Sequence, residues 1–186
     1  MKRIAWITLA WLALMMSAEE ATASGVLVAT HTLNAEQQKT LNAWLKKHPN
    51  LQIRTIEECG CDSDIEALRK GSATETPEPD YNPYLVVGDF RGNGQVDFAI
   101  VLNDLSRIEK NYLDYEVLVV FNGPFHGKDK SPAFIQKNMD IANYALFFSP
   151  QAKRFGIGIA QFNADIATHL IATHNTYKFE QHEQGD

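Results

Sequence analysis

The chain has 186 residues, a formal net charge of −6 and two cysteines. The excess of acidic residues argues against a nucleic-acid partner, because phosphate binding needs clustered lysine and arginine. The length is that of one ordinary domain behind a short leader, large enough to bury a core without staples.

The N-terminus has the features of a cleavable secretory signal. Lys2 and Arg3 form a basic head, residues 4–16 are apolar apart from Thr8, and Ala21-Thr22-Ala23 supplies the small-x-small pattern of a signal-peptidase site. The apolar run is shorter than the roughly 20 residues that span a bilayer. The sequence therefore predicts a cleaved leader, with an uncleaved anchor as the alternative.

Cleavage after Ala23 divides the chain into a signal peptide, residues 1–23, and a single α+β domain, residues 24–186, with cleavage after Ala18 as the alternative. No later segment is long and apolar enough to hold the protein in a membrane. We expect an exported product without membrane insertion, located in the periplasm, with secretion into the medium as the alternative.

Two short helices are predicted near the start of this domain. Asn34 and Gln37 have the spacing of a capping box, and the helix that follows ends at His48-Pro49-Asn50. Ser63 with Glu66 repeats this spacing and predicts a second helix over residues 63–70. Between them, residues 51–55 alternate like a strand, which places Arg54 on the polar side.

The second helix and the loop after it, residues 72–83, are strongly acidic. From Glu57 to Asp80 the sequence has eight acidic residues against Arg69 and Lys70. A site for a cation or a basic partner is one interpretation, and a solvated helix face that runs into a loop is the other.

From residue 84 onward the sequence is typical of β-structure. Branched and aromatic residues predict strands at 84–89, 97–102, 115–121, 144–148, 155–161, 166–172 and 176–180. Short connections favour antiparallel neighbours. The predicted fold class is α+β, with two N-terminal helices packed on one face of a meandering antiparallel sheet and a further helical turn at 132–140.

One stretch carries a chemical motif. Residues 86–101 read V-V-G-D-F-R-G-N-G-Q-V-D-F-A-I-V. This stretch resembles the calcium loop of the FG-GAP and VCBS families, which occurs in integrin-type propellers and in exported bacterial proteins. The remainder is similar to small exported bacterial proteins that carry one such loop. A single repeat cannot build a propeller, so integrin-like adhesion is not implied.

The resemblance implies a calcium site made by Asp89, Asn93 and Asp97 through side-chain oxygens and by Gln95 through its carbonyl. Calcium takes 6 to 8 oxygen ligands, which alternating loop positions can supply. The third loop position departs from the family pattern, because Arg91 offers no oxygen. Two alternatives follow: the guanidinium bridges the carboxylates in place of the ion, or the loop is a structural hairpin with an Asn-Gly turn. The predicted cofactor is therefore one calcium ion or none.

Cys59 and Cys61 lie just before the second helix. Export to an oxidising compartment favours a disulfide between them. Their position beside a helix N-terminus leaves a thiol-exchange role as the alternative, although the Cys-x-x-Cys spacing of thioredoxin-like proteins is absent.

No hydrolase, metalloprotease or nucleotide-binding motif occurs in the sequence. The sequence therefore favours a non-enzymatic binding or accessory protein of the cell envelope, with another protein as its partner. A thiol-disulfide redox protein using Cys59 and Cys61, and a calcium-stabilised structural protein, are the alternatives.

Overall fold

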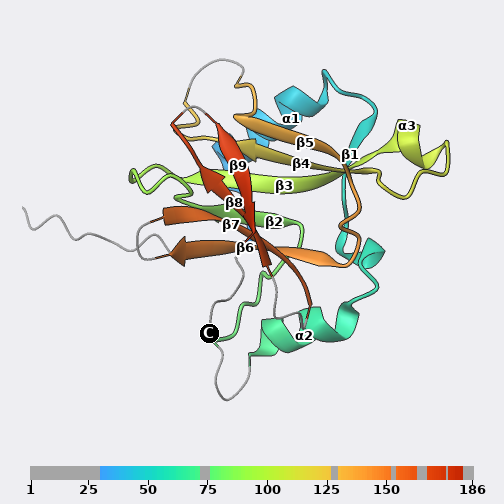
Figure 1. Cartoon of the computed structure of the whole chain (residues 1–186), viewed down its shortest axis with the longest axis horizontal. Coiled ribbons are helices and arrows are strands. Elements are labelled where there is room, and N and C mark those ends of the chain that lie inside the picture. Colours follow the sequence, from blue (N-terminus) through green and yellow to red (C-terminus); the bar gives the residue numbers. More distant parts are fainter. Residues whose placement is uncertain are drawn as a thin grey trace, which may run out of the picture.

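The described part of the chain contains a few short helices, most of them early in the sequence, and two antiparallel sheets (Figure 1). The structure, a computed structural model, describes residues 30–71, 76–126, 130–151, 154–162, 167–174 and 176–181. The predicted signal peptide and residues 72–75 of the predicted loop lie outside these ranges. The helical segments are α1 (Ala35–Leu45), the 3-10 turn η1 (Ile56–Glu58), α2 (Asp62–Lys70) and α3 (Leu105–Ile108). Within the described ranges, no helix has the length and apolar character needed to cross a bilayer.

Helix α1 begins where the sequence predicts. The Asn34 side chain accepts hydrogen bonds from the amides of Glu36 and Gln37, and the Gln37 side chain accepts one from the Asn34 amide. This capping box satisfies amides that have no partner within the helix. Leu41 and Trp44 are buried, so the predicted apolar face is confirmed.

Helix α2 begins one residue earlier than predicted. The amides of Asp64 and Ile65 both donate to the carbonyl of Cys61, which makes Cys61 the N-cap. The predicted capping box of Ser63 with Glu66 is therefore wrong, because Ser63 already lies in the first turn of the helix.

The first sheet has five strands. They are β1 (Leu51–Ile53), β2 (Leu85–Gly88), β3 (Asp97–Asp104), β4 (Glu116–Phe121) and β5 (Phe134–Met139). Strands β1 and β2 both pair with β3, at Leu51 opposite Asp104 and at Leu85 opposite Ile100. The predicted helical turn at 132–140 is wrong, since β5 pairs with β4 along most of its length.

The second sheet is a meander of four consecutive strands. They are β6 (Tyr144–Gln151), β7 (Arg154–Gln161), β8 (Ala167–Ala172) and β9 (Tyr177–Gln181). The strand predictions for this part of the chain agree with the structure to within a few residues. The Leu146 amide donates to the Pro83 carbonyl, which ties β6 to the segment that enters β2.

Two hydrophobic clusters cover the two faces of the five-stranded sheet. Leu41 and Trp44 of α1 belong to the cluster on one face. Ile65 of α2 joins the second sheet in the cluster on the other face. The prediction of two helices on one face of a single sheet is therefore wrong. Strands β3 and β4 are apolar and buried on both sides, which requires cover on both faces.

Candidate functional site

The loop between β2 and β3 is held by an arginine–carboxylate pair. Arg91 donates from Nε to Asp97 Oδ2 at 3.0 Å and from Nη2 to Asp97 Oδ1 at 2.7 Å. The Gly123 amide also donates to Asp97 Oδ1, and the Gly123 carbonyl accepts from Arg91 Nη2. Burial raises the pKa of the Asp97 carboxyl, while these hydrogen bonds oppose the rise. Asp97 is therefore enclosed by protein donors.

The other loop carboxylate, Asp89, accepts hydrogen bonds from two amides of its own loop. The donors are Asn93, to Oδ1 at 3.1 Å, and Gly94, to Oδ2 at 2.6 Å. Asn93 Oδ1 in turn accepts from the Gln95 amide. Gly94 has a φ of 78°, a conformation that favours glycine. The loop oxygens are thus oriented by the chain itself.

This geometry agrees best with the arginine-bridge alternative, although of the two loop carboxylates Arg91 hydrogen-bonds Asp97, whereas Asp89 accepts from loop amides. The strands form an antiparallel hairpin, but Gly88 pairs with Asp97, so the connection spans residues 89–96 and is no two-residue turn. Across the described part of the chain, no group of three or more His, Cys, Asp or Glu side chains is placed to hold a metal ion. Calcium binding by this loop stays a prediction.

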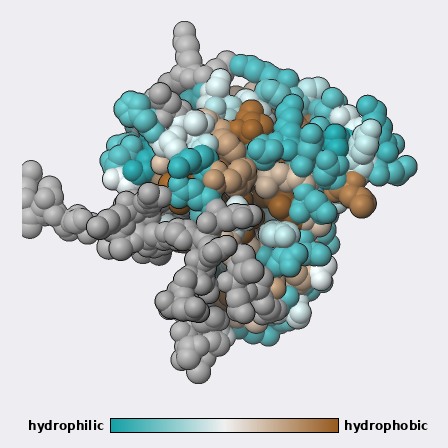
Figure 2. Space-filling model, in the orientation of Figure 1, coloured by the Kyte–Doolittle hydropathy of each residue, from teal (hydrophilic) through white to brown (hydrophobic). Residues whose placement is uncertain are grey.

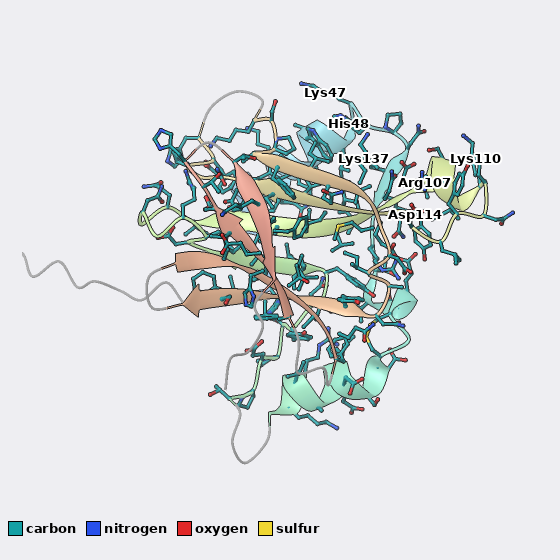
Figure 3. The ribbon with its side chains drawn as sticks, viewed as in Figure 1. Lys47, His48, Arg107, Lys110, Asp114 and Lys137 are labelled. Carbon is teal, nitrogen blue, oxygen red and sulfur yellow. A yellow bond between two sulfur atoms is a disulfide. The ribbon has the colours of Figure 1, made fainter. Side chains whose placement is uncertain are left out.

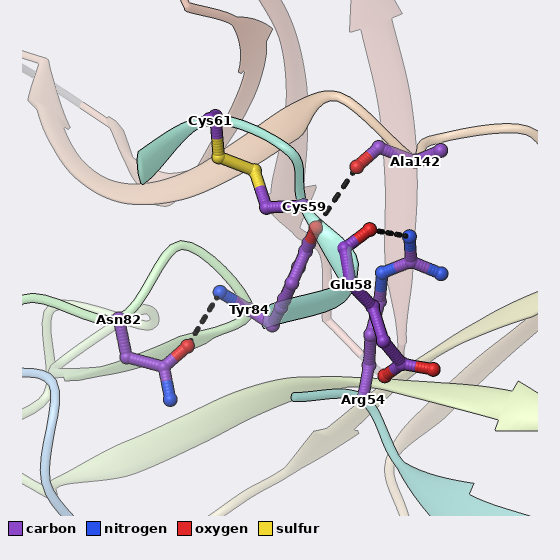
Figure 4. The surroundings of a disulfide bond; sticks show 7 residues. All are labelled: Arg54, Glu58, Cys59, Cys61, Asn82, Tyr84 and Ala142. Carbon is purple, nitrogen blue, oxygen red and sulfur yellow. Dashed lines mark hydrogen bonds between the residues drawn. A yellow bond between two sulfur atoms is a disulfide. The ribbon is translucent and has the colours of Figure 1, made fainter. Parts of the chain in front are cut away.

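Cys59 and Cys61 form a disulfide at the junction of η1 and α2, with their Cα atoms 5.1 Å apart (Figure 4). The two residues are only 4% and 8% exposed. Thiol exchange requires in-line access of a thiolate to a sulfur atom. A disulfide this buried therefore serves better as a structural link than as an exchange site.

Next to the disulfide lies a buried charged cluster that the sequence analysis missed. Arg54 is 2% exposed and donates from Nη1 to Glu116 Oε1 at 2.9 Å and to Asn103 Oδ1 at 3.1 Å. Its Nη2 donates to the Glu58 carbonyl (Figure 4), and its guanidinium lies over the ring of Tyr84. The placement of Arg54 on the polar side of a strand is therefore wrong. The alternation had no signal for this, because the partner Glu116 lies 62 residues away.

The acidic stretch fits the interpretation of a solvated helix face. Glu57, Asp62 and Glu66 are exposed, and Glu66 pairs with Lys70 one helical turn away. The hydrogen bond from Lys70 lowers the pKa of the Glu66 carboxyl.

A second feature that sequence reasoning missed is a projection between β3 and β4, which we call the α3 finger (residues 105–114). Three of its apolar side chains are exposed: Ile108 at 38%, Tyr112 at 48% and Leu113 at 79%. Figure 2 shows hydrophobic atoms at the edge of the molecule where Figure 1 places this segment. The sequence did offer a signal for this surface: Ile108, Tyr112 and Leu113 are apolar residues within a largely polar segment between two predicted strands.

The α3 finger is braced from within. Arg107 donates from Nε to the Asp114 carbonyl at 2.8 Å and from Nη2 to the Asp114 carboxylate at 2.5 Å. The guanidinium lies 4.3 Å from the centre of the Tyr112 ring, and the Tyr112 amide donates to the Arg107 carbonyl. The hydrogen bond from Arg107 lowers the pKa of the Asp114 carboxyl. These contacts tie the two ends of the finger's outer loop together, and Figure 3 shows Arg107 and Asp114 side by side there.

The base of the finger is also fixed. The Asp104 amide donates to the Tyr115 carbonyl at 2.8 Å, which closes the two ends, and the Leu105 amide donates to Asn50. Asp104 caps the short helix α3 by accepting from the Ser106 amide. The exposed apolar residues thus lie on a loop that is hydrogen-bonded at its base and at its outer end.

Comparison with known proteins gave no match: no family model, no curated protein and no solved structure matches this chain.

Proposed function

We propose that the chain is an exported, non-enzymatic binding protein that recognises another protein through the α3 finger. The observation that carries the proposal is the 79% exposure of Leu113 on an internally braced loop. The export part of the proposal comes from the signal-like N-terminus.

A braced apolar projection suits recognition for a physical reason. Binding energy is concentrated in a few anchors, most often Trp, Tyr and Arg, that enter a pocket on the partner and are surrounded by contacts that exclude water. A loop that is already ordered loses little conformational entropy when it binds. Tyr112, stacked on Arg107, and Leu113 beside it have this character.

The charges around the finger favour a partner with an acidic rim. Lys110 of the finger, Lys137 of β5 and Lys47 at the end of α1 lie toward the same upper side of the molecule in Figure 3. The acidic helix α2 lies at the bottom of the same view. Within the finger Glu109 and Asp114 balance Arg107 and Lys110, so Lys137 and Lys47 beside it would orient a negatively charged partner surface toward this side.

The alternatives have less support. A redox role needs an accessible sulfur, and both cysteines are buried. A calcium-stabilised role needs loop oxygens that can reach the ion, whereas Asp97 is fully buried and both its oxygens accept from Arg91.

Site-specific photocrosslinking tests the proposal. Benzoylphenylalanine is placed at Leu113, or at the exposed Glu66 of α2 as the matched control, and the purified chain is irradiated with an envelope extract of its own host. We expect one discrete adduct from position 113 and none from position 66. Excess wild-type chain should suppress the adduct, whereas excess Leu113→Asp chain should not.

The Leu113→Asp variant is a fair competitor, because substitution of so exposed a side chain changes stability by no more than about 0.5 kcal/mol. Equal thermal midpoints would verify this. Arg107→Gln, which removes the brace but leaves Leu113, should compete weakly. No adduct at position 113, or equal suppression by wild type and Leu113→Asp, contradicts the proposal.

A further inference from the structure

A pocket of about 300 Å³ opens between the C-terminal end of α1 and the start of β5. Its apolar lining includes Trp44 and Ile135, and its polar lining includes Lys47, His48, Lys130 and Ser131. None of the described residues that line it carries a carboxylate. The pocket thus combines an apolar surface with three groups that carry, or can take up, positive charge.

The apolar side of the pocket is well ordered. Trp44 is buried, stacks on the His48 ring at 4.1 Å and meets Phe121 edge-on at 5.7 Å. Ile135, which also lines the pocket, is exposed and belongs to β5. A compact apolar group inserted here would have an ordered aromatic ring and a branched side chain to contact.

The polar side has an oriented ammonium donor, Lys130, and a histidine ring whose proton is already used. His48 Nδ1 lies 2.8 Å from the Trp44 carbonyl, and since a carbonyl only accepts, Nδ1 carries the proton. Lys130 Nζ donates to the Asn122 carbonyl at 2.8 Å and lies 5.2 Å from the centre of the Phe125 ring. That bond uses one of its three protons. Burial, with help from Arg91, lowers the pKa of Lys130, so an added anion would relieve a cation that is partly desolvated.

We propose that this pocket binds a carboxylate on a compact apolar stem, with Trp44 and Ile135 contacting the stem and Lys130 contacting the carboxylate. The volume suits one amino-acid side chain with its carboxylate. Two sources share this chemistry: the C-terminal residue of a protein and a free short-chain acid. The site does not include the α3 finger, so its test is independent of the proposed function.

Tryptophan fluorescence provides the measurement. The chain has three tryptophans, at positions 6, 11 and 44, so Trp6→Phe and Trp11→Phe in the full chain leave Trp44 as the only reporter. The probes are N-acetyl-alanyl-leucine, its C-terminal amide and 4-methylpentanoate. We expect a saturable change with both acids, with dissociation constants on the order of 1 mM, as ligands of this size allow. The amide should produce none over the same range.

The two acids distinguish the sources. Tighter binding of N-acetyl-alanyl-leucine identifies a chain end as the ligand, and equal or tighter binding of 4-methylpentanoate identifies a free acid. Both results support the pocket. Binding of the amide as tight as that of the acid, or no saturable change with either acid, overturns it.

Variants tie the signal to the pocket. Lys130→Met should weaken acid binding about tenfold, the loss expected for one charge-assisted hydrogen bond. Lys110→Met, which removes a cation of the finger, is the matched control and should bind as wild type. Ile135→Asp changes an exposed residue, so it should fold normally and abolish binding by like-charge repulsion. Normal binding by Ile135→Asp, or equal losses in Lys130→Met and Lys110→Met, overturns the proposal.

Discussion

Arg91 and Asp97 are joined by two parallel hydrogen bonds, from Nε to Oδ2 at 3.0 Å and from Nη2 to Oδ1 at 2.7 Å. Such forked pairs fix both orientation and distance. Because Asp97 is fully buried and also bonds the Gly123 amide, its carboxylate has little room for a further ligand. The guanidinium thus takes the place at the loop carboxylate that an ion would need.

The first prediction concerns calcium. Calcium should leave the thermal midpoint of the wild-type chain unchanged. Arg91→Asp removes the pair and supplies an oxygen at the third loop position, so in chelator it should lose about 2 kcal/mol. That loss lowers the midpoint by roughly 5 °C, and calcium should recover part of it by binding. Arg91→Met is the control, destabilised and insensitive to calcium. A calcium-dependent midpoint in wild type would show that the loop holds the ion despite Arg91.

The second prediction concerns the buried pair of Arg54 and Glu116, at 2.9 Å. Removing one partner leaves an uncompensated buried charge, so Arg54→Met should cost about 3–5 kcal/mol. The double variant Arg54→Met with Glu116→Leu removes both charges and should cost less than Arg54→Met alone. Urea denaturation of wild type, of Arg54→Met, of Glu116→Leu and of the double variant measures the coupling energy between the two side chains. Additive losses would mean that the two charges act independently.

The third prediction is a dependence of stability on pH. Burial raises the pKa of Glu116 above its ordinary value of 4.5, against the attraction of Arg54. A raised carboxyl pKa means that the folded chain holds the proton more tightly than the unfolded chain. The contribution of Glu116 to the unfolding free energy is therefore greatest below about pH 4 and falls as pH rises through its folded pKa.

Urea denaturation between about pH 4 and pH 7 checks this dependence. Glu116→Gln cannot titrate, so its unfolding free energy should fall less steeply over that window than that of wild type. Burial also raises the pKa of Asp97. The unfolding free energy of Glu116→Gln should therefore still fall as pH rises, although less steeply than that of wild type. A steeper fall in Glu116→Gln than in wild type would mean that the pKa of Glu116 is lowered in the folded chain.

Local patterns predicted local structure well. The start of α1 follows from Asn34 and Gln37, three residues apart, because the hydrogen bonds of a capping box are made within one turn. Arg91 and Asp97 are six residues apart, so the sequence could suggest their contact. The arginine bridge was one of three interpretations of this loop, beside a calcium site and a structural hairpin. Strand positions were equally accessible, since alternation and branched residues are local signals.

What the sequence could not predict depends on distant partners. Residues 132–140 begin with a proline and are rich in polar side chains, yet most of them form strand β5 because β4 offers an unpaired edge. The burial of Arg54 depends on Glu116 in another strand. The sequence did contain a signal that both faces of the sheet are covered. Residues 98–102 and 117–121 are continuous apolar runs, which are typical of strands buried on both sides.

The last prediction concerns the disulfide. Cys59 and Cys61 close a very small loop, for which the chain-entropy relation gives a stabilisation of roughly 1–2 kcal/mol. The chain with Cys59→Ala and Cys61→Ala should therefore fold and lose about that much stability in urea denaturation. The Glu58 carbonyl that contacts Arg54 directly precedes the disulfide, so a larger loss would indicate that the link also holds the buried cluster in place.

Accessibility of the two sulfur atoms separates a structural role from a redox role. Both cysteines are almost fully buried, so a phosphine reductant followed by maleimide should label them slowly in the native chain and rapidly in urea. The native chain should also fail to catalyse reduction of a model protein disulfide. Rapid labelling of the native chain, with catalysis lost in Cys61→Ala, would instead assign the pair to thiol-disulfide exchange, because a reactive pair must expose at least one sulfur to its substrate.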